Sequence, residues 1–210
     1  MRLIKDKKSL SQIGIRYEKV SFENTMLDLN YSFNKAYERC KKYCEVQEEA
    51  IKKGQGMYIF GNVGVGKTHL LSCIANNLTE QKVQVLFTNF FEISNAIKFT
   101  QEKRKVKEEI ELIEKIINMP ILLLDDLGMG LGQGNDSGEE NQNLLFNLLN
   151  KRYNNNKATI FASNYKIEEL NEKCGIYEQT IDRIYEMSSG VKLEIPGESV
   201  RKNLKVKIEY

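Results

Sequence analysis

The sequence lacks any long run of apolar residues. No stretch of the 210-residue chain approaches the roughly 20 residues that a membrane-spanning helix requires. The N-terminus also lacks the apolar centre of a secretory signal. We therefore expect a cytoplasmic protein that makes no membrane contact.

The chain also carries no large excess of positive or negative charge. The chain has 31 Lys and Arg against 29 Asp and Glu, a formal net charge of +2. Overall charge therefore indicates no class of partner, and a nucleic-acid site would have to come from local clustering of basic residues.

Histidine and cysteine, the usual ligands of zinc, are few, with one histidine and four cysteines. Cys40 and Cys44 are one helical turn apart, but no second pair of Cys or His lies near them. They belong instead to an apolar helical stripe formed by Phe33, Ala36, Tyr37, Cys40, Cys44, Gln47 and Ile51. We predict buried, structural cysteines rather than a zinc site.

Glycines are concentrated in "GNVGVGKTH", between a strand-like run and a helix-like run. The spacing is that of the P-loop, G-x-x-x-x-G-K-[ST], in which backbone N–H groups at a helix start form a nest for phosphate. The flanking strand and helix disfavour a chance glycine-rich turn. The pattern predicts binding of a nucleoside triphosphate and Mg²⁺, with the lysine on the β- and γ-phosphates and the threonine hydroxyl on the metal. The predicted contacts are Gly61, Asn62, Val63, Gly64, Val65, Gly66, Lys67, Thr68 and His69.

Strand-like and helix-like segments alternate beyond this point. Strands are predicted at 57–60, 83–88, 121–124, 158–163 and 191–195, with "LKVKIEY" (204–210) a candidate for one more. A long charged helix is expected at about 91–118, stopped by Pro120, and others at 139–153 and up to 189. Because the strands are almost wholly apolar, we predict an α/β fold of the P-loop NTPase type, a parallel sheet with helices on both faces.

The segment before the sheet is predicted to differ from it. Residues 1–24 are polar and basic at the start and indicate a mobile arm, and residues 30–53 form the amphipathic helix. We therefore expect an N-terminal arm and helix at 1–53 and an ATPase domain at 54–210.

Acidic and amide side chains follow two of the strands. In "ILLLDDLG", Asp125 is expected to hold Mg²⁺ and Asp126 to orient and polarise an attacking water. An ordinary strand that ends in an acidic turn is the alternative. The strand 158–163 ends at Asn164, which could bind both a water and a phosphate oxygen or could simply form a turn. A strand lies between the P-loop and "ILLLDDLG" along the chain, which suits NTPases that place another strand between these two in the sheet.

Over about residues 50 to 205 the sequence resembles the AAA+ helicase loaders of the DnaC/DnaI type and the related transposition ATPase IstB. The resemblance rests on "GNVGVGKTHLL", "ILLLDDLG", "NLLFNLLNKRY", "TIFASNY", "IDRIYE" and "GESVR". It implies that Asn164 is the sensor-1 residue, Arg183 an arginine finger offered to a neighbouring subunit, and Arg201 the sensor-2 arginine. It also implies an AAA+ fold with a truncated or absent helical lid. Position 126 is Asp where many AAA+ proteins have Glu.

The resemblance implies a replicative helicase loader. Such a protein would be a weak ATPase used as a switch, would self-associate through its ATP sites, and would contact a hexameric helicase and single-stranded DNA. The alternative is an IstB-like helper that recruits a transposase to DNA. A small-molecule kinase is disfavoured, because "GMGLGQGNDSGEENQ" has no arginine for a mobile lid.

Two charged segments leave alternatives open. The basic residues of 98–107 (Lys98, Lys103, Arg104, Lys105 and Lys107) could contact DNA phosphates or form the solvated face of a helix. In "IYEQTIDRIYEM", Ile181, Ile184 and Tyr185 are spaced as an inward face, which places Arg183 on the opposite side.

Overall fold

A parallel five-stranded sheet forms the centre of the protein in the computed structural model, which describes residues 14, 17–25, 31–131, 138–188 and 190–199. The strand order is β2-β3-β4-β1-β5, and every neighbouring pair is parallel. The strands are β1 (Met57–Phe60), β2 (Val85–Asn89), β3 (Ile121–Leu127), β4 (Ala158–Ser163) and β5 (Lys192–Glu194). The predicted α/β fold is confirmed.

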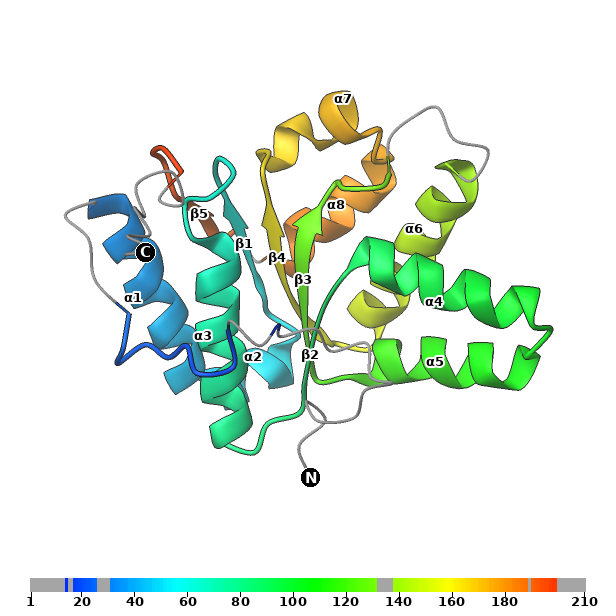
Figure 1. Ribbon diagram of the computed structural model, residues 1–210, viewed down its shortest axis with the longest axis horizontal. Coiled ribbons are helices and arrows are strands. Elements are labelled where there is room, and N and C mark those ends of the chain that lie inside the picture. The colour runs from blue at the N-terminus through cyan, green and yellow to red at the C-terminus, as the bar shows by residue number, and fades with distance from the viewer. Residues whose placement is uncertain (1–13, 15–16, 26–30, 132–137, 189, 200–210) are drawn as a thin grey trace, which may run out of the picture.

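Helices cover both faces of the sheet (Figure 1). On one face lie α1 (Tyr31–Glu45), α2 (Gln47–Lys53) and α3 (Lys67–Glu80). On the other lie α4 (Phe90–Glu102), α5 (Val106–Asn118), α6 (Gly138–Asn154), α7 (Leu170–Cys174) and α8 (Glu178–Met187), with a 3-10 turn at Ile167–Glu169. Neighbouring strand residues serve different cores, since Ile59 packs on the α1/α3 side and Tyr58 on the α6/α8 side. Within the described part of the chain, no helix combines the length and the apolarity needed to cross a membrane.

The sheet order brings three loops to one edge. β4 lies between β1 and β3, so the segments that follow the carboxyl ends of these strands are neighbours. They are the P-loop after β1, the acidic turn at the end of β3 and Asn164 after β4. The strand predicted to separate the P-loop strand from the acidic strand is therefore β4. This carboxyl edge is where ligands bind in open α/β sheets.

Both long helices predicted from the sequence are divided in two. Residues 91–118 form α4 and α5, with a turn at Lys103–Lys105 in which Arg104 has a φ of +52°. All residues from 101 to 108 are exposed, so no core contact would hold a continuous helix through this stretch. By turning back, the chain lets each half bury its own apolar face. Residues 30–53 likewise divide at Val46 into α1 and α2.

The prediction of a mobile arm at residues 1–24 is wrong for residues 17–24, which pack together with Thr25. Phe22 is buried, and its carbonyl accepts a hydrogen bond of 2.8 Å from the Tyr37 hydroxyl. The Asn76 side chain of α3 donates to the carbonyls of Tyr17 and Val20. This segment, the N-terminal strap (residues 17–25), is therefore part of the packed protein, whereas residues 1–13 lie outside the described residues.

Residues on both sides of position 53 share one core. The buried face of α1 packs with β1 and α3, and the strap residue Phe22 joins the same cluster. The division into 1–53 and 54–210 stays a prediction.

The cysteines are buried, as predicted. All four are buried and none forms a disulfide. Among the described residues, no group of three or more His, Cys, Asp or Glu is arranged to hold a metal ion.

Arg152 of α6 is a fully buried cation that joins three elements. Its guanidinium donates to the carbonyls of Ile116, Ile117 and Met119 at the end of α5, and to Ala158 O and Thr159 Oγ1 at the start of β4. Burial lowers the pKa of Arg152 to about 9. These bonds satisfy carbonyls that a helix end leaves without partners, so Arg152 anchors the base of the α4–α5 pair to the sheet.

Candidate functional site

The loop between β1 and α3 takes a shape that requires glycine. Gly64 and Gly66 have φ values of +84° and +110°, in the left-handed region, and Gly66 caps the start of α3. A helix start offers unpaired N–H groups and the positive end of a dipole, which together favour an anion.

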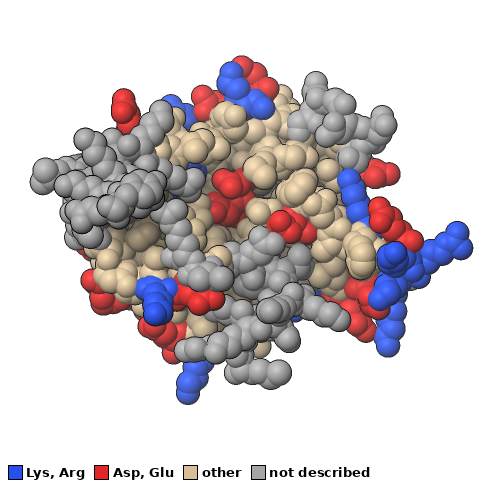
Figure 2. Space-filling model, viewed as in Figure 1, with Lys and Arg blue, Asp and Glu red and all other residues tan. Residues whose placement is uncertain are grey.

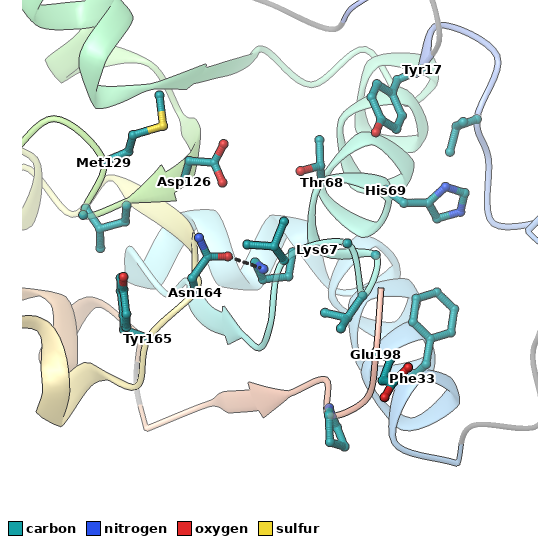
Figure 3. Close-up of a pocket in the computed structure, with 18 of the residues that line it drawn as sticks. Tyr17, Phe33, Lys67, Thr68, His69, Asp126, Met129, Asn164, Tyr165 and Glu198 are labelled. Atoms are coloured by element: carbon teal, nitrogen blue, oxygen red, sulfur yellow. Dashed lines mark hydrogen bonds between the residues drawn. The ribbon is translucent and has the colours of Figure 1, made fainter. Parts of the chain in front are cut away.

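Lys67, the first residue of α3, ties this loop to β4. Its side chain is only 5% exposed, and its ammonium donates to Gly61 O at 2.7 Å and to Asn62 O at 2.9 Å. A third bond of 2.8 Å goes to Oδ1 of Asn164 (Figure 3). The P-loop cation and the predicted sensor-1 amide are thus in direct contact.

The acidic pair lies in a bulge of β3. Leu124 pairs with Phe161 and Leu127 with Ser163, so Asp125 and Asp126 together face one residue of β4. Asp126 takes a φ of +48°, and its N–H donates to Oδ1 of Asp125 at 2.9 Å. The extra residue allows Asp126 to line a pocket while Asp125, 7% exposed, stays buried beside it.

The environment of Asp125 opposes its ionisation. Burial, followed by the neighbouring charge of Asp126, raises the pKa of Asp125 to about 6, although Thr68 and Lys67 act in the opposite direction. A divalent cation beside Thr68 and Asp125 would offset this unfavourable pairing of carboxylates. Hydroxyl and carboxylate oxygens are donors that Mg²⁺ prefers, so the residues present fit the predicted metal.

A pocket of about 810 Å³ opens over these groups, enough for a ligand of cofactor size. At one end are the aromatic side chains of Tyr17 and Phe33, with Glu198 beside Phe33; at the other are Asp126, Asn164, Met129 and Tyr165 (Figure 3). Lys67 and Thr68 lie between the two ends. An elongated ligand with a flat apolar part and an anionic part suits this arrangement.

The strap is the part of the site that sequence reasoning missed. Tyr17, Val20, Asn24 and Thr25 all line the pocket. Val20 and Phe22, two apolar residues in a polar stretch, were the available signal. His69 lines the pocket too, and its Nε2 lies 2.9 Å from the Thr25 hydroxyl, so it holds the end of the strap against α3. Burial lowers the pKa of His69.

The segment after β5 closes the other side of the P-loop. Ile195 N donates to Phe60 O at 2.8 Å, and the Asn62 side chain donates to Gly197 O at 3.2 Å. A Cβ atom on Gly64 would lie 2.1 Å from the Ser199 hydroxyl, so glycine is required there for packing as well as for conformation. Of the remaining predicted loop contacts, Val63 and Val65 line the pocket.

Arg183 lies on α8, outside this pocket. Its guanidinium is 4.7 Å from the centre of the Tyr153 ring, bonds to the Asn150 side chain at 3.2 Å and forms an ion pair with Glu186. The predicted inward face is correct for Ile184, which is buried, and for Ile181, which is partly buried against the same core, but wrong for Tyr185, which is 49% exposed. The Lys192 ammonium lies 4.7 Å from the centre of the Tyr185 ring. Arg201 lies outside the described residues.

The family model for the IstB-like ATP binding protein matches residues 2–208. The chain belongs to this family. It is 26% identical over 206 residues to the replicative helicase loader DnaC of Buchnera aphidicola subsp. Baizongia pistaciae, covering 97% of this chain and 78% of the relative. It is 29% identical over 118 residues to the loader DnaI of Bacillus subtilis, covering 56% of this chain but only 36% of DnaI.

The fold is that of P-loop AAA+ proteins. A structure of the replication initiator DnaA bound to AMPPCP and single-stranded DNA is 25% identical to this chain, with a TM-score of 0.67, over 86% of this chain and 50% of DnaA. The predicted fold and family are confirmed.

Proposed function

We propose that the protein is an ATP-dependent switch that loads a replicative hexameric helicase onto single-stranded DNA. The contact of Lys67 with Asn164 carries this proposal, because it joins a phosphate-binding loop to an amide at the edge where Asp126 enters the pocket. A ligand that draws the lysine toward phosphate changes what Asn164 bonds, which gives the protein two states.

The pocket would hold ATP with its base near the strap and Phe33 and its triphosphate along the P-loop. Lys67 and the N-terminus of α3 would bind the phosphates, Thr68 and Asp125 would hold Mg²⁺, and Asp126 would orient the attacking water. The metal would supply charge stabilisation at the phosphoryl oxygens. Asn164 would orient water or the γ-phosphate, and Arg201 would act as sensor 2.

Self-association completes the site. Because Arg183 lies outside the pocket of its own chain, its guanidinium acts on ATP bound by a neighbouring copy. Its partners Tyr153, Asn150 and Glu186 hold the side chain in a fixed direction. We infer that hydrolysis is slow in the monomer and faster in the assembly.

The turn between α4 and α5 is the proposed contact for single-stranded DNA. Basic side chains gather there, at the right-hand edge of Figure 2. Phe99 is 56% exposed with the Lys103 ammonium 5.9 Å from its ring centre, a combination suited to base stacking beside a phosphate. Two of the cations are partly neutralised, since Lys105 pairs with Glu108 and Lys107 with Glu111. The alternative is that these basic side chains form only a solvated face and do not contact DNA.

A pull-down with the full chain as bait tests the function. Bound to ATP-Mg²⁺, the parent should retain the replicative helicase of its host, and Lys67→Ala should not. Lys53→Ala, an exposed lysine paired with Glu49, is the matched control. Retention of a transposase instead would support the IstB-like alternative. If neither partner is retained in any nucleotide state, the loader proposal fails.

A further inference from the structure

Ser163, the last residue of β4, lies at the junction of three loops that the proposed function uses. It is fully buried, and its carbonyl accepts from the N–H of Gly61, the first P-loop glycine, at 3.3 Å. Its hydroxyl donates to Leu127 O at 2.7 Å, directly after Asp126. The same hydroxyl accepts from the N–H of Tyr165, directly after Asn164, at 3.2 Å. One small residue therefore contacts the P-loop, the acidic turn and the segment of Asn164.

Tyr58 of β1 also fixes the segment that contains Asn164 and Tyr165. The side chain is fully buried, and its hydroxyl donates to Tyr165 O at 2.8 Å. Burial raises the pKa of Tyr58, so the hydroxyl stays protonated and remains a donor at neutral pH. Both backbone polar groups of Tyr165 are thus fixed by side chains, and its neighbour Asn164 has little freedom to turn.

Lys67 fixes the side chain of Asn164, whereas Ser163 and Tyr58 fix the backbone beside it. Asp126 lies in the bulge of β3, between the pairing of Leu124 with Phe161 and that of Leu127 with Ser163, and Asn164 follows the last of these pairings. At that last pairing, the Ser163 hydroxyl bonds to both the acidic turn and the segment of Asn164. A displacement of about 1 Å of a reacting group can lower a rate about a hundredfold, so such a bond matters for turnover.

We propose that Ser163 and Tyr58 are positioning residues that set the Asn164 amide and the Asp126 carboxylate relative to the P-loop. The proposal rests on the proposed function at this site. Neither residue lines the pocket, so neither contacts nucleotide, and both act through their neighbours.

Single hydroxyl deletions test the proposal. Tyr58→Phe and Ser163→Ala should each lower kcat for ATP hydrolysis about tenfold, while the Kd values for ATP and ADP change by less than about threefold. Ser163→Thr, which keeps the hydroxyl, should restore most of the turnover. Rates are compared at a temperature where every variant is folded by circular dichroism.

Matched controls separate positioning from stability. Tyr43→Phe removes a buried hydroxyl that donates to Gln55 O at 2.8 Å, and Ser188→Ala one that donates to Ile184 O at 2.6 Å. Both control variants should lose about as much thermal stability as the site variants but keep the parental kcat. If the controls lose as much turnover as the site variants, or if Tyr58→Phe and Ser163→Ala keep it, the positioning role is overturned. If Ser163→Thr does not fold, the test of the positioning role is the kcat of Tyr58→Phe compared with the kcat of Tyr43→Phe.

Measurements on the parent protein distinguish a failure of the positioning role from a failure of the proposed function. If the parent binds ATP without turnover, the ATPase part fails, and the ratio of ATP to ADP affinity becomes the measurement. Tyr58→Phe should then reduce that ratio and Tyr43→Phe should not; an unchanged ratio in Tyr58→Phe overturns the role. If the parent binds no ATP, both proposals are wrong.

Discussion

Lys67 and Asn164 are 97 positions apart in the sequence, and the ammonium of one donates to the side-chain oxygen of the other at 2.8 Å. The pair predicts that nucleotide binding and turnover can be separated. Lys67→Ala should weaken ATP-Mg²⁺ binding at least tenfold, because a charge-assisted bond contributes about 1.5–3 kcal/mol. Asn164→Ala should leave ADP affinity within about threefold and lower kcat, since an amide that orients water acts in the transition state. Calorimetry measures the nucleotide affinities, and single-turnover hydrolysis measures the rate. If Lys67→Ala binds ATP-Mg²⁺ as tightly as the parent, the P-loop assignment is wrong.

Asp125 predicts an unusual pH dependence of stability. Its folded-state pKa of about 6 lies above the ordinary value of 3.8, so ionisation opposes folding. The penalty is absent below about pH 4, grows as the pH rises to about 6, and above that reaches about 2–3 kcal/mol. Asp125→Asn should therefore raise the melting temperature at pH 7 and lose this advantage as the pH falls from 6 to 4.

Melting curves in EDTA across this pH range measure the effect. Glu114→Gln, at an exposed acid of α5, is the control and should follow the parent at every pH. Added Mg²⁺ and nucleotide should stabilise the parent but not Asp125→Asn. A melting temperature that responds to pH equally in the parent and in Asp125→Asn would contradict the prediction.

The α4–α5 turn predicts a salt-dependent affinity for DNA. Replacing Lys103, Arg104 and Lys105 with Ala should weaken binding of a labelled single strand. The slope of log K against log salt should fall by about 0.7 for each phosphate that the variant no longer neutralises. Phe99→Ala should weaken binding without changing the slope, because stacking releases no counterions. Replacing Lys42, Lys52 and Lys53, exposed or partly exposed lysines of α1 and α2, is the control for charge alone. If both triple variants have the parental slope, the turn is a solvated surface.

Arg183 predicts activity shared between subunits. Arg183→Ala should keep ATP affinity, and its melting temperature should fall little because the ion pair with Glu186 is partly exposed, with its Arg183 side chain 32% accessible. Hydrolysis in the assembled state should fall about a thousandfold or more, the effect of an arginine finger. Mixing Arg183→Ala with Lys67→Ala should restore part of the activity, since one chain then supplies an intact pocket and the other an intact finger. An inactive mixture, with subunit exchange verified by fluorescence transfer, would refute the role in trans.

Arg152 predicts a large loss of stability from one substitution. Arg152→Met would leave several buried carbonyls without a donor, at about 1–3 kcal/mol for each group left unsatisfied. We expect the free energy of unfolding in urea to fall by about 3 kcal/mol or more. Lys151→Met, at the exposed neighbouring position of α6, should stay close to the parent. Equal stability of the two variants would mean that water replaces the guanidinium.

The features that the sequence predicted well are local or strongly periodic. The apolar run before Asp125 and the fixed spacing from Gly61 to Thr68 allow little besides a buried strand and a P-loop, so the sheet and the loop could be inferred from short windows. The breaks at Val46 and at Lys103–Lys105 could not, because they depend on where the core ends rather than on local propensity.

Other parts of the site depend on tertiary contacts. Nothing local in residues 17–25 indicates that Asn76 and Tyr37 bind their carbonyls. Tyr185 matches an inward helical spacing, yet it lies at the surface because α8 buries a stripe narrower than the pattern suggests, centred on Thr180, Ile184 and Met187.

The segment 195–199, which packs on the P-loop through Phe60, Asn62 and Gly64, bears on the order of events during synthesis. The ribosome completes the P-loop motif by residue 68, but one wall of that loop is not translated until about 130 residues later. A nascent chain that has only the P-loop outside the ribosome still lacks β5 and this wall. Nucleotide can therefore meet a P-loop enclosed on both sides only after residues 195–199 have left the ribosome.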